Sequence, residues 1–357
     1  MPVLDKSNAA DVARYENFIK SSPYGRATQD MNWSQVKNNW ESDYVYLEEN
    51  GEIIAALSIL SIEAVDDASF SYASRGPVSD FTDIELTKRL IEEAKPVIEA
   101  KNSFLLRIDP AFKYDEEIVN LYRDAGFKFR SRETEIKSFS QPRYDMILDL
   151  KDKTSEEVLK EFRQNTRYSV RQSIKKGVTT RWSRTPEDLD IFYDMTIIMA
   201  ERQGITYRPK SYFERLLAAF PDIRIYVSEF EGNPLSTAIA FPYNKEMWYI
   251  YGASNGECRN MSPAYNTMWT MICDSIEMGL HSYNFGGIFE IDENDGLYVF
   301  KDGFCKKDGP TEWIGELDVV YDEDKYNKFI SRYFRINIWI DCFCKFISKC
   351  PARKSRR

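Results

Sequence analysis

The chain has 357 residues, of which 43% are hydrophobic and 29% are charged, and its formal net charge is −9. This composition is typical of a folded protein with two domains of ordinary size and argues against disorder. The acidic excess argues against nonspecific coating of nucleic acid, although it leaves room for a local basic patch.

A single histidine, His281, excludes several classes of site. A Ser-His-Asp or Cys-His triad needs a histidine, and nothing near His281 resembles a nucleophile elbow. A His-rich metal site is excluded in the same way, and neither a P-loop nor a GxGxxG fingerprint follows an expected strand. We therefore expect no metal and no nucleotide cofactor.

The six cysteines lack the spacing of a disulfide framework or a zinc site, which predicts reduced thiols in a cytoplasm. The first residues, MPVLDKSNAADV, lack the basic and apolar regions of a secretory signal. No stretch approaches the roughly 20 apolar residues that span a bilayer. These features predict a cytoplasmic protein.

The first half of the chain predicts a helix, a hairpin, a third strand, and then alternating helices and strands. The hairpin at 44–60 has an acidic tip that contains Gly51, which favours a tight turn. In chain order the sequence predicts a helix at 11–20, the hairpin at 44–60, a strand at 69–74, a helix at 83–101, a strand at 104–108 and a helix at 116–125, which precedes the residues GFKF at 126–129.

The second half repeats this order. Its hairpin at 224–241 has the same kind of tip around Gly232. The predicted elements are helices at 155–176 and 187–203, the hairpin, a strand at 247–253, a helix at about 265–278 and a strand at 282–285. The shared order predicts an α/β (α+β) fold of two acetyltransferase-like, or GNAT-like, domains related by internal duplication.

One stretch in the second half corresponds to the acetyl-CoA signature R-x-x-G-x-A, which precedes the central helix of such a domain. Here the residues run from Arg259 to Ala264, Ser262 replaces the glycine, and Pro263 removes a backbone amide donor. The degraded signature suggests an acyl donor other than acetyl-CoA.

The predicted helix at 155–176 is strongly basic. Thr154 and Glu157 form a capping box, Gly177 provides a stop, and eight of the nine charged residues between 160 and 184 are basic. Six cations lie on or beside one stripe of this helix: Lys160, Arg163, Arg167, Arg171, Lys175 and Lys176. The neighbouring stripe is apolar and consists of Leu159, Phe162, Thr166, Val170 and Ile174. Two interpretations stay open, a solvated helix face and a face that contacts RNA phosphates. No interleaved exposed aromatic residue is expected, which favours structured RNA over stacked single-stranded bases.

Several motifs together resemble the Fem family of non-ribosomal peptidyl transferases, which add amino acids from aminoacyl-tRNA to peptidoglycan precursors. The motifs are SPYGRATQDMNWSQVKNNW, YASRGPV, TRYSVRQSIKKGV, MAERQGITYRPKSYFERL, MWYIYGAS, SYNFGGI and LYVFKDGF. The resemblance reaches to about residue 330. It implies a first domain at 1–147 completed by a returning segment at 313–332, a second domain at 148–312, and no coiled-coil insertion.

The resemblance implies a cytoplasmic aminoacyl-tRNA-dependent ligase of cell-wall synthesis. An aminoacyltransferase of this kind would move Ala, Ser or Gly from aminoacyl-tRNA to the side-chain amine of Lys in the soluble UDP-MurNAc-pentapeptide and so start the interpeptide bridge. We expect a monomer that needs no cofactor. The alternatives are a CoA-dependent N-acyltransferase and an RNA-binding module without catalysis.

The resemblance also implies site residues. Lys301, in an expected polar loop, would face the donor ester and stabilise developing charge, with Phe300 beside it as a wall. Lys37 and Arg208 would contact the UDP diphosphate, and the neighbouring contacts would come from Thr206, Tyr212 and Tyr251. Gly286 and Gly287 would provide a turn or a close backbone approach.

Asp109 matches an acidic residue near the acceptor peptide. As a general base it is a poor match to an amine, because an unperturbed aspartate has a pKa of about 3.9. The sequence therefore predicts a modest effect when Asp109 is replaced.

Residues 333–357 extend beyond the resemblance. They are apolar and aromatic and end in Arg353, Lys354, Arg356 and Arg357. Three roles stay open: peripheral contact with the inner face of an anionic membrane, packing on the first domain, and contact with tRNA.

Overall fold

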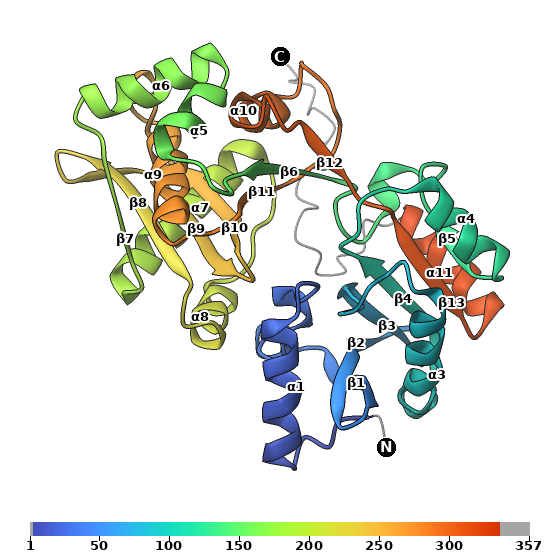
Figure 1. The fold of residues 1–357 in the computed structure, drawn as a ribbon. Coiled ribbons are helices and arrows are strands. Elements are labelled where there is room, and N and C mark those ends of the chain that lie inside the picture. Colours follow the sequence, from blue (N-terminus) through green and yellow to red (C-terminus); the bar gives the residue numbers. More distant parts are fainter. Residues whose placement is uncertain (1–2, 336–357) are drawn as a thin grey trace, which may run out of the picture. The chain divides into compact units, whose positions relative to one another are not determined.

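The computed structural model describes residues 3–335, which divide into two compact units (Figure 1). The first unit contains residues 3–145 and the returning segment from 311, and the second contains residues 146–310. The chain therefore passes between the units twice. The boundaries expected from the sequence, after 147 and after 312, lie slightly further along than those of the structure, after 145 and after 310.

The first unit is built on a sheet with strand order β1-β2-β3-β4-β13-β5. The pair β3–β4 is parallel, and the other neighbours are antiparallel. The returning segment thus supplies a strand that lies between two strands of the N-terminal part. The strands are β1 (Glu41–Glu49), β2 (Glu52–Val65), β3 (Ala68–Arg75), β4 (Ser103–Pro110), β5 (Lys128–Arg130) and β13 (Glu316–Val320).

Helices cover both faces of this sheet because its strands alternate apolar residues on the two sides. Val45 and Leu57 contribute to the core that α3 covers, whereas Tyr44 and Ala56 pack against α1. Phe329 of α11 stacks on Phe70 of β3. The helices are α1 (Ala9–Ser21), α2 (Trp33–Val36), α3 (Ile84–Ala100), α4 (Glu116–Asp124) and α11 (Glu323–Arg335), with short 3₁₀ turns at Ala27–Gln29 and Ile136–Ser138.

The second unit has a sheet with strand order β12-β6-β11-β10-β9-β8-β7. Its strands are β6 (Tyr144–Asp149), β7 (Thr179–Ser183), β8 (Arg224–Phe230), β9 (Asn233–Tyr243), β10 (Glu246–Ser254), β11 (Ser282–Ile288) and β12 (Pro310–Glu312). Its helices are α5 (Ser155–Glu161), α6 (Gln164–Lys175), α7 (Pro186–Gln203), α8 (Lys210–Ala219), α9 (Pro263–Glu277) and α10 (Gly296–Phe304), with a 3₁₀ turn at Arg259–Met261.

The order of elements in the two units is the same, as the sequence predicts. Each unit has an antiparallel hairpin (β1–β2 and β8–β9), a third antiparallel strand (β3 and β10), a helix (α3 and α9) and a strand parallel to the third (β4 and β11). Both hairpin tips place two residues at positive φ, at Asn50–Gly51 and Glu231–Gly232. Glycine makes this conformation available without steric strain.

Two predicted elements differ in the structure. The helix expected at 155–176 is two helices, because Phe162 and Arg163 between them adopt extended backbone conformations. The polar loop expected around Lys301 is the helix α10. Within residues 3–335 the longest helix is α7 with 18 residues, so no helical arm interrupts the second unit there. Among the described residues, no helix combines the length and apolar character that crossing a membrane requires.

Candidate active site

Lys301 lies in the second unit on α10, which begins at an N-cap formed by Asp295. The Asp295 carboxylate accepts hydrogen bonds from the backbone amides of Leu297 and Tyr298, at 2.7 and 2.9 Å. Lys301 is 5% exposed, and its Nζ donates to the carbonyl oxygen of Gly287 at 2.8 Å. The expectation of a polar loop is wrong, because Lys301 lies on a helix as a buried cation whose ammonium group is held at the end of β11.

The backbone of β11 turns sharply next to this ammonium group. Gly286 has a φ of 73°, and its amide donates to the side-chain oxygen of Asn284 at 2.7 Å. A Cβ atom at Gly286 would lie 3.9 Å from the Lys301 Nζ. Phe300 is half-buried and packs edge-on against Tyr265, with ring centroids 5.0 Å apart. The turn expected from the sequence is therefore present at Gly286, whereas a Cβ there would make only ordinary contacts and the close backbone approach stays a prediction.

Three of the expected acceptor contacts come together in the second unit. The Arg208 Nε donates to the Tyr251 hydroxyl at 3.0 Å, and its guanidinium carbon lies 4.5 Å from the centre of the Tyr212 ring. The Tyr251 hydroxyl donates to that of Tyr212 at 3.2 Å. These bonds fix the guanidinium group in one orientation, which is what planar recognition of a phosphate requires. Thr206, two residues before Arg208, lies in the segment between α7 and α8 and is exposed.

Lys37 lies in the first unit at the C-terminal end of α2. It is 4% exposed, its backbone amide donates to the Trp33 carbonyl, and its own carbonyl accepts from the Trp40 amide. Because Lys37 and Arg208 belong to different units, their joint contact with one diphosphate stays a prediction.

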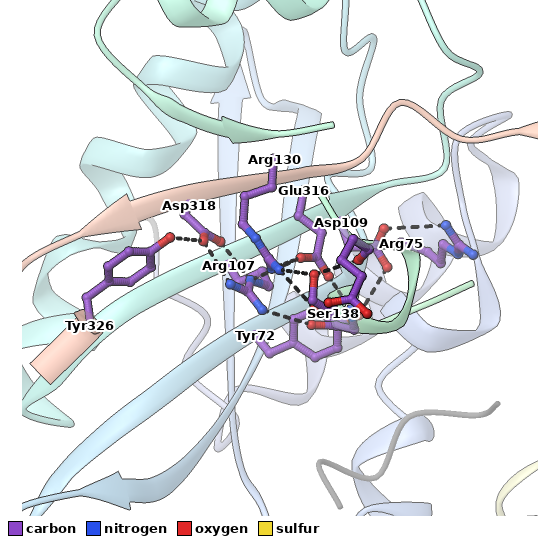
Figure 2. Close-up of polar contacts among 11 residues, drawn as sticks. Tyr72, Arg75, Arg107, Asp109, Arg130, Ser138, Glu316, Asp318 and Tyr326 are labelled. Carbon is purple, nitrogen blue, oxygen red and sulfur yellow. Dashed lines mark hydrogen bonds and ion pairs between the residues drawn. The ribbon is translucent and has the colours of Figure 1, made fainter. Parts of the chain in front are cut away.

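Asp109 occupies a buried polar cluster of the first unit (Figure 2). Its carboxylate accepts a hydrogen bond from the Tyr72 hydroxyl at 3.0 Å and pairs with the Arg75 guanidinium at 3.4 Å. Burial raises the pKa of Asp109 to about 7, and the nearby charges of Glu316 and Asp145 also raise it, against the opposing effects of Arg75 and Tyr72. The pKa of about 3.9 assumed from the sequence is therefore wrong, and with it the reason for expecting a poor base.

The returning strand β13 supplies two further carboxylates of this cluster, Glu316 and Asp318. Arg107 is fully buried, and its Nε and Nη2 donate to the two carboxylate oxygens of Asp318 at 2.7 and 2.8 Å. Glu316 pairs with Arg130, and the Tyr326 hydroxyl donates to Asp318 at 3.0 Å (Figure 2). The sequence reasoning missed these residues. The available signal was a charge at every second position of an apolar strand, in GELDVV at 315–320.

The six cations predicted to contact tRNA have different roles within the second unit. Arg163 pairs with Asp302, Arg167 donates to the carbonyls of Lys160 and Phe162, and Lys176 donates to the carbonyl of Asn260. Three of the six, Lys160, Arg171 and Lys175, are exposed and have no side-chain partner among the described residues.

The aromatic and apolar residues of α6 also depart from the prediction. Tyr168 is 64% exposed and Ile174 is 53% exposed. The expectation that no exposed aromatic residue interleaves with the cations is therefore wrong, and so is the place of Ile174 in the apolar stripe. Thr166, Val170 and Ile174 all lie within α6, where positions four apart drift by about 40° each. The buried face of α6 therefore runs through Thr166, Val170 and Ser173 and leaves Ile174 exposed at its edge.

The degraded acetyl-CoA signature, Arg259–Ala264, forms the loop before α9 and the first two residues of this helix. Ser262 adopts a left-handed conformation with φ 55°, and Pro263 is the first residue of the helix. A left-handed conformation favours glycine, and proline contributes no amide to a helix N-terminus. Among the described residues, no group of three or more His, Cys, Asp or Glu side chains is arranged to hold a metal ion.

The model of the FemAB family matches residues 11–231 and 224–329 of this chain. A UDP-N-acetylmuramoylpentapeptide-lysine N(6)-alanyltransferase of Weissella viridescens is 39% identical over 337 residues, which cover 92% of this chain and 99% of that protein. A lipid II:glycine glycyltransferase of Staphylococcus epidermidis is 26% identical over 399 residues, which cover 91% and 94%. The chain belongs to the FemAB family, and the resemblance noted in its motifs is confirmed.

Solved structures agree on the fold. The crystal structure of FemX matches with a TM-score of 0.82 at 23% identity, covering 92% of this chain and 100% of that one. A tandem GNAT protein from the clavulanic acid biosynthesis pathway matches with a TM-score of 0.51 at 10% identity, covering 89% and 97%. The predicted fold class, two GNAT-like domains in tandem, is confirmed.

Proposed function

We propose that the chain is an aminoacyltransferase that moves an amino acid from aminoacyl-tRNA to the side-chain amine of Lys in UDP-MurNAc-pentapeptide, as a step in building the peptidoglycan bridge. The observation that carries this function is the 39% identity to the lysine N(6)-alanyltransferase over 92% of the chain. The same likeness makes alanine the first candidate among the amino acids, and a UDP-linked precursor the first candidate for the acceptor.

The reaction is the aminolysis of an ester. The acceptor amine attacks the carbonyl carbon of the aminoacyl ester, a C–N bond forms, the ester C–O bond breaks, and the ribose hydroxyl leaves with a proton from the amine. The chemistry makes two demands on the protein: a donor for the oxyanion that forms on the ester carbonyl, and an acceptor for the amine proton. Lys301 is the proposed donor, and Asp109 is the candidate for the second role.

A CoA-dependent acyl transfer is the weaker alternative. The loop that would bind the pyrophosphate of CoA has Ser262 in a left-handed conformation and Pro263 at the first helical position. The loop therefore offers fewer backbone amides to an anion than the acetyl-CoA signature does.

The test of the function is a donor panel with one acceptor. Purified protein is incubated with UDP-MurNAc-pentapeptide and with alanyl-, seryl- or glycyl-tRNA or acetyl-CoA, and the product is identified by mass spectrometry. We expect addition of one amino acid to the Lys side chain, and no acetylation. Acetylation without aminoacyl transfer would contradict the proposal, and so would the absence of any product with all four donors.

Removing a cation from the proposed diphosphate site should weaken acceptor binding more than the chemical step. Lys37→Met and Arg208→Ala are each expected to raise KM for the UDP-linked acceptor. The factor should correspond to a loss of roughly 1.5–3 kcal/mol of binding free energy, the value of a hydrogen bond to a charged group. Steady-state kinetics measures this change. Lys20→Met, which removes a half-exposed charge from α1, is the control. Unchanged KM values in both variants would remove these two residues from the acceptor site.

The exposed cations of α6 provide a test of tRNA as the donor. We expect the double variant Arg171→Gln, Lys175→Gln to weaken binding of aminoacyl-tRNA and to reduce the magnitude of the salt slope by about 1–2, because each lost phosphate contact contributes roughly 0.7–0.9. Binding is measured at several salt concentrations. Lys88→Gln, Lys95→Gln on α3 removes the same number of exposed charges and serves as the matched control. A slope equal to that of the parent would identify the α6 face as merely solvated.

A further inference from the structure

The helix that carries Lys301 is attached to the break between α5 and α6. The backbone amide of Arg163, at this break, donates to the carbonyl oxygen of Gly303 at 2.8 Å. The Arg163 guanidinium pairs with Asp302, the residue that follows Lys301, and Asp302 is itself 6% exposed. One residue of the break therefore contacts two consecutive residues of α10 through its backbone and its side chain.

The two helices also meet at Gly303. A Cβ atom built there would lie 2.3 Å from the Oγ1 of Thr166, a buried residue in the first turn of α6. Real Cβ contacts do not become so short, so an alanine at this position would force either the Thr166 side chain or α10 to move. Next to this contact, the rings of Phe162 and Phe304 meet edge-on, with centroids 5.1 Å apart.

These contacts also explain why the helix predicted at 155–176 is broken. Phe162 turns inward between Phe304 and Trp269, and Arg163 gives its amide to α10 instead of to a carbonyl of its own helix. Figure 1 shows α10 next to α6, in agreement with their contacts. The residues at the break therefore form part of the surface on which α10 packs.

We propose that Arg163, Thr166 and Gly303 form a clamp that positions the Lys301 ammonium group for the transfer reaction. Arg163 is then a positioning residue that acts through α10, and not one of the cations that contact tRNA. This inference rests on the proposed function in one respect, since it takes Lys301 as the group that faces the reacting ester.

The clamp can position the ammonium group because it contacts α10 close to Lys301. Lys301 lies two residues before Gly303 on the same helix, and its Nζ is already fixed at its far end by the Gly287 carbonyl. A shift of α10 would strain that hydrogen bond or break it. Displacement of a catalytic group by about 1 Å can cost about 10²-fold in rate.

The chain offers a substitution with a matched control and a rescue. Gly303→Ala introduces the clash, although alanine favours a helix by about 1 kcal/mol relative to glycine, so a loss cannot come from helix propensity. Gly296→Ala, in the first turn of the same helix, meets nothing within 4 Å and is the control. Adding Thr166→Ala removes the Oγ1 atom, after which the nearest atom of residue 166 is its Cβ at 3.5 Å, an ordinary contact distance.

We expect Gly303→Ala to lower kcat by about 10–100-fold, with KM for tRNA and for the acceptor nearly unchanged. The double variant Gly303→Ala, Thr166→Ala should return to the kcat of Thr166→Ala alone, and Gly296→Ala should match the parent. Hydrogen exchange of the amides in 296–304 gives a second readout: exchange should be faster in Gly303→Ala and slow again in the double variant.

Arg163 distinguishes positioning from RNA binding. Arg163→Gln and Asp302→Asn should each lower kcat, their effects should not add because they break one interaction, and the salt slope of tRNA binding should stay at the parental value. A normal kcat in Gly303→Ala, a loss that Thr166→Ala does not restore, or a reduced salt slope in Arg163→Gln would overturn the clamp. If the unmodified protein transfers no amino acid at all, the proposed function fails, whereas hydrogen exchange still tests the clamp.

Discussion

Lys301→Met should lower kcat by about 10²–10³-fold, the usual cost of removing one oxyanion donor. Methionine fills the same buried space without the charge, so the fold should persist. The ammonium group would meet an oxygen that becomes negative only as the amine attacks, and its loss should therefore appear in kcat and hardly in KM for either substrate. Single-turnover kinetics with preformed aminoacyl-tRNA measures the chemical step directly.

Lys306→Met is the control for this change. Lys306 lies shortly after α10 and is exposed, so the variant removes the same charge from the same region without emptying the buried site. We expect it to retain the parental kcat. Near-parental turnover by Lys301→Met would instead make the ammonium group a structural support for the Gly287 carbonyl, and the oxyanion donor would have to be sought elsewhere.

Asp109→Asn is expected to lower kcat by about 10²-fold or more, in the range of general base catalysis. A carboxylate with a pKa of about 7 is matched to a neutral operating pH, unlike the unperturbed group assumed from the sequence. The parent should lose activity as the pH falls through about 7, and this acid limb should be missing in the variant. A modest loss with the limb retained would leave Asp109 as a residue that positions the acceptor.

The same substitution should stabilise the first unit at alkaline pH. The pKa of Asp109 is about 7 in the folded protein, against about 3.9 in an unfolded chain. Between these values the folded state binds more protons, so the stability of the parent falls as the pH rises from about 4 to 7. Asparagine carries no charge, and about three pKa units at 1.36 kcal/mol correspond to a gain of up to about 4 kcal/mol above pH 7.

Thermal unfolding of the parent and Asp109→Asn, at pH values from 5 to 8.5, measures this difference. The gain should shrink as the pH falls. Asp67→Asn, in the exposed turn before β3, is the control and should show no such trend. A constant difference between parent and Asp109→Asn would mean that Asp109 is ionised throughout this range.

The architecture was predictable from the sequence because it depends on local patterns. Alternating apolar residues around Gly51 and Gly232 define the two hairpins, and the capping box of Thr154 and Glu157 marks the start of α5 as expected. The end of α5 was not predictable. It depends on the burial of Phe162 against Phe304, which lies far along the chain.

Three of the expected site residues were predictable as neighbours, whereas the surroundings of the others were not. Arg208, Tyr212 and Tyr251, implied by family resemblance, do contact one another. The burial of Lys301 and the raised pKa of Asp109 could not be predicted from the sequence, because both depend on tertiary contacts. For Asp109 the decisive neighbours include Glu316, a residue of the returning strand. The segment 333–357, for which three roles were expected, lies almost entirely outside the described residues, which end at 335.

The position of β13 between β4 and β5 has a consequence for synthesis on the ribosome. Arg107 and its partner Asp318 are separated by 211 residues. At translation rates of about 5–20 residues per second, Asp318 is synthesised roughly 10–40 s after Arg107. Closing the sheet earlier would bury an unpaired charge, at a cost of several kcal/mol. The N-terminal half should therefore stay open on the nascent chain while the second unit folds, and the first domain to be made would be the last to be completed.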